Sequence, residues 1–310
     1  MPKEKTLIIK LGYSETLVPE ISRTTSLGDV LRSTVLLSLF SRTNVTWLVD
    51  AQAIPLLKGN PHIQRIMPYD MTSVLQLRAE RFDAIVNLEK VAGVCAFADS
   101  LASNRRFGFR YDPDSGSVMA YDGSQHIIEL CSNPVDKAVN TRCWEELLFE
   151  MVGGKWRGEV PLLGYGPKSR LQHDIGLNHH VGAKWPIKAW PAGHWQRLVK
   201  IIGNRRSVSW QEGLNSLEEY FEWINSCSLI VTNDSLGLHI AHALGKKIVA
   251  LFGPTPANEI YVKNGVKLLP QTSPECMPCM STVCKRGRTC MHDIGPEQVA
   301  AAIDGLMEGN

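Results

Sequence analysis

The segment from Leu229 to Thr255, LIVTNDSLGLHIAHALGKKIVALFGPT, constrains the fold more than any other part of the chain. Its pattern predicts a buried strand at 229–231, a polar turn at 232–237, a helix at 238–244 and a second buried strand at 248–252. A strand, a helix and a strand in this order form one βαβ unit of a parallel sheet. The chain is therefore expected to contain an α/β domain.

Two loops of this segment are expected to lie on the same edge of the sheet. One runs from Asn233 to Gly237 and opens the helix, with His239 in the first helical turn, and the other runs from Phe252 to Pro256. Unpaired backbone N–H groups at a helix N-terminus favour an anion. Ligands of open α/β sheets bind at the carboxyl ends of the strands. The segment therefore predicts a site for a phosphorylated ligand.

The rest of the chain repeats the same alternation of strands and helices, which is typical of doubly wound parallel sheets. A polar stretch rich in glycine and proline, from Gly153 to Lys168, separates two such halves. We predict an α/β protein with two Rossmann-like domains, at 1–165 and 166–310. The second domain includes a cysteine-rich segment at 276–290 and a terminal helix at 296–307.

Composition excludes several classes of function. The 310 residues include 33 basic and 31 acidic side chains, a net charge of only +2, so charge does not favour nucleic-acid binding. No stretch approaches about 18 uncharged apolar residues, and the apolar run Leu7–Ile9 is too short for a signal peptide. The expected location is cytoplasmic, where the protein could still dock on the inner membrane as a peripheral protein.

The motif Asp234-Ser235-Leu236-Gly237-Leu238-His239, followed by Phe252-Gly253-Pro254-Thr255, resembles the donor-site signature of glycosyltransferase family 9, the ADP-heptose:lipopolysaccharide heptosyltransferase family. The family's usual order is Asp-Ser-Gly-x-x-His, so the glycine here stands one position later. The resemblance extends from Leu7 to about Ile294. It implies the GT-B architecture, in which two Rossmann-like domains face each other across a cleft.

The resemblance also implies which residues bind a nucleotide-sugar donor. Lys188-Ala189-Trp190-Pro191 matches a Lys-x-Trp-Pro element whose lysine contacts the donor phosphates in the family. Fixed cations can stabilise a departing diphosphate without a divalent metal. The expected donor-binding residues are Lys184, Lys188, Glu212, Asn233, Asp234, Ser235, Leu236, Gly237, His239, Pro254 and Thr255. Without the resemblance, the segment with Lys184 and Lys188 is also consistent with a basic surface loop packed by tryptophans. His239 is then consistent with a purely structural role at the start of the helix.

A metal-dependent alternative would need an Asp-x-Asp motif. Asp112-Pro113-Asp114 has that spacing, but its proline and the following Ser-Gly are more typical of a turn.

The sequence Ser26-Leu27-Gly28-Asp29 has two interpretations. The residues themselves are typical of a helix start, with Ser26 as the N-cap and Asp29 as the acid of a capping box. The family resemblance implies instead that Asp29 is the catalytic base that deprotonates an acceptor hydroxyl, with Ser26 and Gly28 on the acceptor side. An insertion at 11–25 precedes this helix and is either a surface loop or a part of the acceptor site.

Four cysteines lie close together, at Cys276, Cys279, Cys284 and Cys290. Four thiolates can hold a structural zinc or iron ion, which would leave no open position for catalysis. Reduced thiols that pack a loop, or a disulfide pair, are the alternatives. We expect no catalytic cofactor.

Together, the resemblance implies an inverting, metal-independent glycosyltransferase. The implied reaction moves a sugar, heptose from ADP-heptose first of all, to a hydroxyl acceptor such as the lipopolysaccharide core, another glycan or a glycolipid. Two alternatives stay open: a GT-B nucleotide-sugar epimerase, and a catalytically silent nucleotide-binding scaffold protein.

Overall fold

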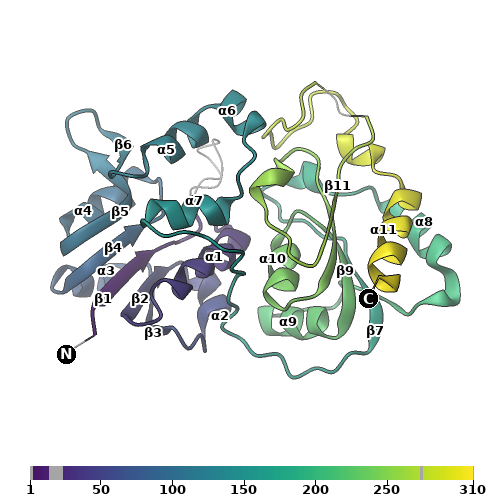
Figure 1. Ribbon diagram of the computed structural model, residues 1–310, viewed down its shortest axis with the longest axis horizontal. Helices are drawn as coiled ribbons and strands as arrows, with labels where there is room; N and C mark the ends of the chain where they lie inside the picture. The colour runs from purple at the N-terminus through teal and green to yellow at the C-terminus, as the bar shows by residue number, and fades with distance from the viewer. Residues whose placement is uncertain (1–2, 14–23, 273–274, 310) are drawn as a thin grey trace. The chain divides into compact units, whose positions relative to one another are not determined.

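The computed structural model describes residues 3–13, 24–272 and 275–309. The chain folds into two compact units (Figure 1). Unit 1 comprises Met1–Lys137 and Arg142–Gly166, and unit 2 comprises Ala138–Thr141 and Pro167–Asn310. Most of the predicted insertion at 11–25 lies outside the described residues.

The described part of unit 1 contains one six-stranded sheet in the order β3-β2-β1-β4-β5-β6. The first five strands in that order are parallel, and β6 closes an antiparallel hairpin with β5. The strands are β1 (Lys5–Ile9), β2 (Asn44–Val49), β3 (Ile63–Pro68), β4 (Arg81–Asn87), β5 (Ala102–Asp112) and β6 (Ser117–Ala120). The hairpin occupies the region where glycine, aspartate and serine predict a loop or hairpin.

Helices alternate with these strands. They are α1 (Leu27–Ser33), α2 (Ile54–Leu57), α3 (Met71–Arg78), α4 (Ala92–Ser100), α5 (Gln125–Ser132), α6 (Pro134–Val139) and α7 (Trp144–Met151), with 3₁₀ turns at Thr34–Ser38 and Ala51–Ala53. The first helix is thus an α-helix that tightens into a 3₁₀ turn. The Thr34 hydroxyl donates to the Leu31 carbonyl oxygen at 2.5 Å, and such local bonds compete with the regular helical pattern.

Both faces of the unit 1 sheet are buried, as parallel sheets require. Leu7 and Ile9 belong to a core cluster that also contains Leu77 of α3 and Val94 of α4. Ile8 points to the opposite face and is also fully buried.

The described part of unit 2 contains a five-stranded parallel sheet in the order β11-β10-β9-β7-β8. The strands are β7 (His173–Asn178), β8 (Val208–Trp210), β9 (Cys227–Asn233), β10 (Lys247–Leu251) and β11 (Gly265–Leu268). The α-helices are α8 (Ala192–Ile202), α9 (Leu217–Asn225), α10 (Leu236–Ala243) and α11 (Pro296–Glu308), with 3₁₀ turns at Pro186–Lys188, Gly203–Arg205, Ala257–Glu259 and Cys290–Asp293.

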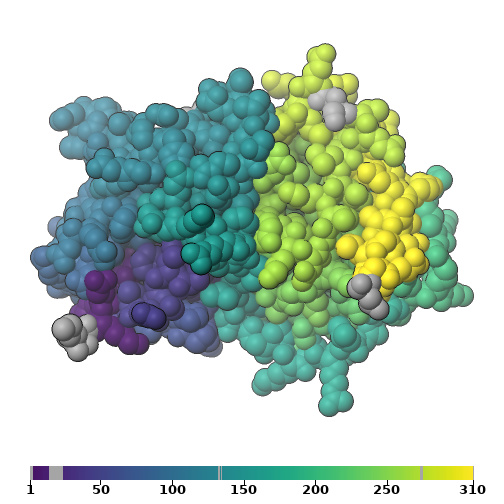
Figure 2. All heavy atoms as spheres, in the orientation of Figure 1, coloured from purple at the N-terminus to yellow at the C-terminus, as the bar shows by residue number. Residues whose placement is uncertain are grey.

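Alternate residues of β9 build the two layers of unit 2. Leu229 and Val231 belong to a core cluster with Leu198 of α8 and Ile303 of α11. Ile230 lies on the other face and is fully buried as well. Helices α8 and α11 contact each other, and Figure 2 shows α11 in yellow on the outer surface of this unit.

The strand order defines a switch point in each sheet, where the chain changes direction across the sheet. It lies between β1 and β4 in unit 1 and between β7 and β9 in unit 2. Ligands of doubly wound sheets bind at the carboxyl ends of the strands at such points. The predicted α/β class with two Rossmann-like units is confirmed.

The helix after β9 begins earlier than predicted. Helix α10 starts at Leu236, and strand β9 continues to Asn233. The polar turn expected at 232–237 is therefore reduced to Asp234 and Ser235, and Gly237 is helical. Helices α5 and α6 and strand β11 have no counterpart among the predicted elements.

In the described parts of the chain, no helix is both long and apolar enough to cross a membrane.

Candidate functional site

Three predicted donor-binding residues meet at the carboxyl edge of the unit 2 sheet. The Lys188 ammonium nitrogen lies 2.6 Å from Asp234 Oδ2, and the Thr255 hydroxyl donates to the same oxygen at 2.7 Å. Lys188 ends a 3₁₀ turn after β7, Asp234 follows β9, and Thr255 follows β10. Three loops of adjacent strands thus converge beside the switch point, at the N-terminus of α10.

The surroundings of Asp234 favour its ionised form. Burial alone would raise the pKa of this carboxyl, but the charge of Lys188 and the hydrogen bonds from Lys188 and Thr255 outweigh burial, and His239 adds a smaller effect. Together they lower the pKa of Asp234 from 3.8 to about 2. Asp234 therefore holds the Lys188 ammonium in place as a permanent anion.

The Lys188 loop is fixed to the sheet by a side-chain amide. Asn233 Oδ1 accepts from the backbone N–H of Trp190 at 2.9 Å, and Asn233 Nδ2 donates to the His179 carbonyl oxygen at 3.0 Å. The side chain of Trp190 is itself anchored, since its indole N–H donates to the Ile294 carbonyl oxygen at 2.9 Å. Asn233 was predicted to contact the donor, and here its amide holds the loop that carries Lys188.

A buried polar network lies beneath the first turn of α10. Asn178, at the end of β7, donates to Thr232 Oγ1 at 2.7 Å and to Ser235 Oγ at 3.0 Å, and its Oδ1 accepts from the Tyr220 hydroxyl. Asn178 and Thr232 are fully buried. The network therefore fixes Ser235, the N-cap of α10.

This network explains the position of the glycine in the motif. A Cβ atom on Gly237 would lie 2.4 Å from both Asn178 Nδ2 and the Tyr220 hydroxyl, a distance that real Cβ atoms do not reach. Position 237 thus has no room for a side chain. The glycine serves close packing of the helix on the sheet rather than an unusual turn.

The other predicted donor residues differ in exposure. Lys184, His239, Pro254 and Thr255 are buried, Ser235 and Leu236 are half-buried, and Glu212 is exposed just beyond the end of β8. All except Glu212 and Lys184 lie in the two loops and the helix that surround Asp234. The structure brings Lys188, Asp234 and Thr255 into direct contact.

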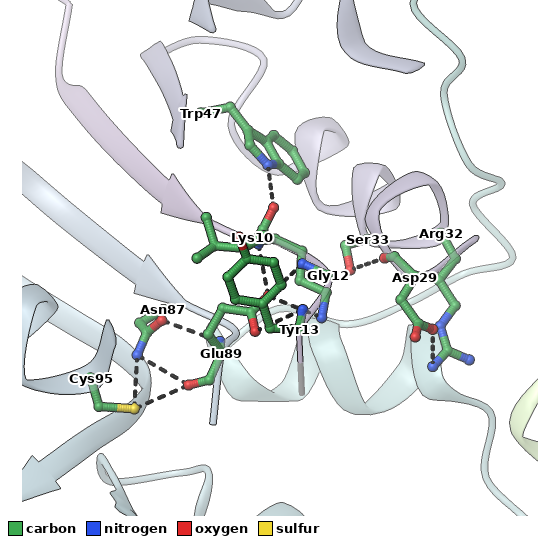
Figure 3. Close-up of polar contacts among 11 residues, drawn as sticks. Lys10, Gly12, Tyr13, Asp29, Arg32, Ser33, Trp47, Asn87, Glu89 and Cys95 are labelled. Carbon is green, nitrogen blue, oxygen red and sulfur yellow. Dashed lines mark hydrogen bonds and ion pairs between the residues drawn. The ribbon is translucent and has the colours of Figure 1, made fainter. Parts of the chain in front are cut away.

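In unit 1, Asp29 lies in the first turn of α1, as predicted. Ser26 is the N-cap, but its side chain makes no capping hydrogen bond. Asp29 Oδ1 instead lies 2.5 Å from Arg32 Nη2 (Figure 3). The Arg32 guanidinium carbon lies 5.4 Å from the centre of the Trp144 ring. Arg32 thus holds the Asp29 carboxylate at the first turn of α1. The preceding residue, Gly28, is half-buried.

Sequence reasoning missed the charged pair Lys10 and Glu89, which lies at the switch point of unit 1. Glu89 is fully buried, and its Oε1 lies 3.3 Å from Lys10 Nζ. The available signal was position: Lys10 follows β1 and Glu89 lies two residues after the end of β4, at the edge where ligands bind in doubly wound sheets.

The four clustered cysteines line one cavity of about 680 Å³ in unit 2, together with Ile187, the neighbour of Lys188. Burial, and to a smaller extent the neighbouring cysteines, raise the pKa of Cys290 to about 11. Among the residues that the structure describes, no group of three or more His, Cys, Asp or Glu side chains is placed to hold a metal ion. The expected structural metal is therefore not supported.

The cysteine segment contacts the loop after β10, which contains Pro254 and Thr255. The Met280 backbone N–H donates to the Pro254 carbonyl oxygen at 2.9 Å. A Cβ atom on Gly253 would lie 2.6 Å from Met291 Sδ and 2.8 Å from Cys290 Sγ. Residues 276–291 thus support the loop that carries Thr255.

The Asp-x-Asp look-alike lies in the β5–β6 hairpin. Ser115 Oγ donates to Asp112 Oδ2 at 2.5 Å, and this hydrogen bond is the main cause that lowers the pKa of Asp112. Asp112 is half-buried at the end of β5, and the residues that follow it are exposed, as expected for a hairpin turn.

Comparison with known proteins matches part of unit 2 to a family. The sequence profile of "Glycosyltransferase family 9 (heptosyltransferase)" matches residues 213–289. A lipooligosaccharide heptosyltransferase 2 of Campylobacter jejuni is 37% identical over 83 residues, which are 26% of this chain and 26% of that protein. The match thus spans about a quarter of the length of that relative. A lipopolysaccharide heptosyltransferase 1 of Campylobacter coli is 22% identical over 303 residues, 81% of this chain and 88% of that protein.

A solved structure extends the likeness to the whole fold. The ADP-heptose lipopolysaccharide heptosyltransferase II of Escherichia coli superposes with a TM-score of 0.67 at 16% identity, covering 98% of each chain. At this identity the likeness concerns the fold. The comparisons confirm the resemblance that the sequence motifs predict: residues 213–289 match glycosyltransferase family 9, and the chain as a whole shares the fold of a heptosyltransferase.

Proposed function

We propose that the protein is an inverting, metal-independent glycosyltransferase that transfers heptose from ADP-heptose to a hydroxyl acceptor. The observation that carries this proposal is the contact of Lys188, Asp234 and Thr255 at the switch point of unit 2. Asp234 and Thr255 lie within residues 213–289, which match the family profile. The relatives named above are heptosyltransferases, which supports this reaction over an epimerase or a silent scaffold.

In this proposal unit 2 binds the donor. The Lys188 ammonium has three N–H donors, and the bond to Asp234 uses one of them. Its charge and the N-terminus of α10 would stabilise the diphosphate as negative charge develops on it. Thr255, Pro254, Ser235, Leu236 and His239 surround this position in the donor loops. A fixed ammonium can thus perform the charge neutralisation for which other glycosyltransferases use a divalent metal.

Unit 1 supplies the base in this proposal. Asp29 would take the proton from the acceptor hydroxyl while that oxygen attacks the anomeric carbon. The new glycosidic bond forms as the bond to the diphosphate breaks, so a single displacement inverts the anomeric centre. The ion pair with Arg32 orients the Asp29 carboxylate for this step.

The acceptor is proposed only as a class, a hydroxyl-bearing glycan such as the lipopolysaccharide core, by analogy with the relatives. Use of a nucleotide-sugar donor supports the predicted cytoplasmic location, and the predicted peripheral contact with the inner membrane stays a prediction. We assign the cysteine segment no chemical step, only support of the donor loop.

The variant Asp29→Asn tests the assignment of the base. Asparagine keeps the size of the side chain and an oxygen for Arg32 but cannot accept the proton, so kcat should fall by about 10²-fold or more while the Kd for ADP changes by less than about twofold. Steady-state kinetics and calorimetric titration with ADP measure the two quantities.

Asp112→Asn is the matched control, because it removes another carboxylate from the same unit. It should change neither kcat nor the Kd for ADP. Preserved turnover in the Asp29 variant, or lost ADP binding without lost turnover, would contradict the assignment.

A further inference from the structure

The connection between β1 and α1 is fixed by one buried carboxylate. Glu89 Oε1 accepts from the backbone N–H groups of Leu11 at 2.7 Å and Gly12 at 2.8 Å, and Glu89 Oε2 accepts from Tyr13 at 3.3 Å (Figure 3). Three consecutive amides thus point at a single fully buried side chain. Lys10 supplies the compensating positive charge.

Glu89 is itself held rigidly at the end of β4. Its backbone N–H donates to Asn87 Oδ1 at 3.2 Å, and its carbonyl oxygen accepts from Cys95 Sγ at 3.1 Å. The side chain therefore crosses the switch point of the sheet, from the end of β4 to the chain that leaves β1. A carboxylate that accepts several backbone N–H bonds makes strong, charge-assisted contacts.

A short series of hydrogen bonds continues from this clamp to Asp29. The N–H of Gly12 is bound by Glu89, and the carbonyl oxygen of the same residue accepts from the Ser26 N–H at 2.8 Å. The Ser26 carbonyl oxygen then accepts from the Asp29 N–H at 3.1 Å, which opens α1. The start of α1 is thus tied to the sheet through residue 12.

Gly12 is the residue of this connection whose backbone conformation and close contacts favour glycine. Its φ of +93° lies in the left-handed region that favours glycine, and an added Cβ would lie 3.1 Å from the backbone nitrogen and oxygen of Ser26. The backbone of residue 12 therefore lies against the N-cap of α1, and any shift at residue 12 reaches the first turn of that helix.

We propose that Glu89 is a positioning residue for the transfer reaction: by clamping residues 11–13 it sets the place of the α1 N-terminus and so the place of Asp29. This inference rests on the proposed role of Asp29 as the base. Glu89 touches neither substrate in this account, and it acts through the backbone of residues 11–13 and its ion pair with Lys10. Its loss should therefore affect kcat and leave donor binding unchanged.

Three variants of the full chain test the proposal. Glu89→Ala removes all three acceptor bonds, whereas Glu89→Gln keeps an oxygen that can accept from Leu11 and Gly12. Phe82→Leu is the control, because it alters the buried core of unit 1 at the other end of β4. Amide hydrogen exchange at 11–13 and 26–30, kcat, and the Kd for ADP are measured for each.

Glu89→Ala should raise amide exchange at 26–30 by about tenfold or more and lower kcat by about tenfold or more, with the Kd for ADP within about twofold. Glu89→Gln should restore most of the protection and most of kcat. The proposal is overturned if 26–30 stays protected in Glu89→Ala, or if Phe82→Leu at matched thermal stability gives the same exchange and the same kcat. Because exchange needs no turnover, failure of the proposed function, seen as absent transfer by the unaltered protein, remains distinguishable from failure of the clamp.

Discussion

At the scale of single residues, the proposed donor site depends on one ion pair whose members come from different loops. Lys188 and Asp234 are each at most 13% exposed in their side chains, so both lose most of their hydration. Removing one partner from such a pair leaves an uncompensated buried charge, which destabilises a protein far more than loss of a surface pair. The pair therefore contributes both to the stability of unit 2 and to the geometry of its site.

The lowered pKa of Asp234 predicts how stability depends on pH. A folded-state pKa of about 2 against an ordinary value of 3.8 means that the unfolded chain binds this proton more readily. The stabilisation is therefore fully present above about pH 4 and is lost as pH falls towards 2. It amounts to about 2 kcal/mol at neutral pH.

Urea unfolding of the unaltered protein and of Asp234→Asn, compared across this range, measures the effect. The difference in the free energy of unfolding should shrink steadily between about pH 4 and about pH 2. A difference that stays constant over the same range would show that the carboxylate is not selectively stabilised in the folded state.

Residues that carry a motif were predictable, and residues that support the motif were not. Lys188, Asp234 and Thr255 stand in recognisable patterns, and they meet because the loops after adjacent parallel strands lie at one edge of the sheet. Asn178 and Tyr220 lie far from the motif in sequence, and only the folded sheet brings their side chains beneath Gly237. Glu89 was missed for the same reason, because its partners lie more than 70 positions away along the chain.

At the scale of elements, the residue preferences of the sequence did not predict where helix α10 begins. The residues Asn233-Asp234-Ser235 and Gly237 favour a turn, and the pattern alone places the helix start at Leu238. In the structure Ser235 is the N-cap and Gly237 is already the second helical residue, because the Asn178 network leaves space only for a glycine. Tertiary packing thus decides the boundary.

Gly237→Ala should destabilise the protein by about 1–3 kcal/mol, since the new methyl group overlaps a fully buried amide and a tyrosine hydroxyl. Gly193→Ala is a matched control at the second residue of α8, where an added Cβ meets no atom within 4 Å. The control should be neutral or stabilising by about 0.4–1 kcal/mol. Urea unfolding gives both values, and equal effects of the two substitutions would refute the packing explanation.

Regular elements of the sheets were predictable because buried strands give short apolar runs. Helices α5 and α6 were missed because they have only 8 and 6 residues, and Pro134 separates them, so each offers too short a pattern. Strand β11 has only four residues at the edge of its sheet, too short for a periodic pattern.

At the scale of the whole molecule, the two units divide the proposed reaction. Both contain a doubly wound sheet with a switch point, and in each the chemistry-bearing residues lie at the carboxyl ends of the strands beside that point. Unit 1 contributes Asp29 and its clamp, and unit 2 contributes the ammonium and the helix N-terminus for the diphosphate. This division follows from the fold, since parallel sheets present their loops at one edge.

The measurement that tests the central claim most directly is thermal unfolding of the protein with ADP, GDP, UDP, CMP, dTDP and ADP-heptose, each with and without EDTA. Ligands that bind the folded state raise Tm according to their affinity. We expect a selective rise with ADP and ADP-heptose that survives EDTA, because Lys188 and α10 supply the positive charge for the diphosphate. A rise with another nucleotide, a rise that EDTA abolishes, or no rise with any of them would contradict a metal-independent enzyme that uses ADP-heptose.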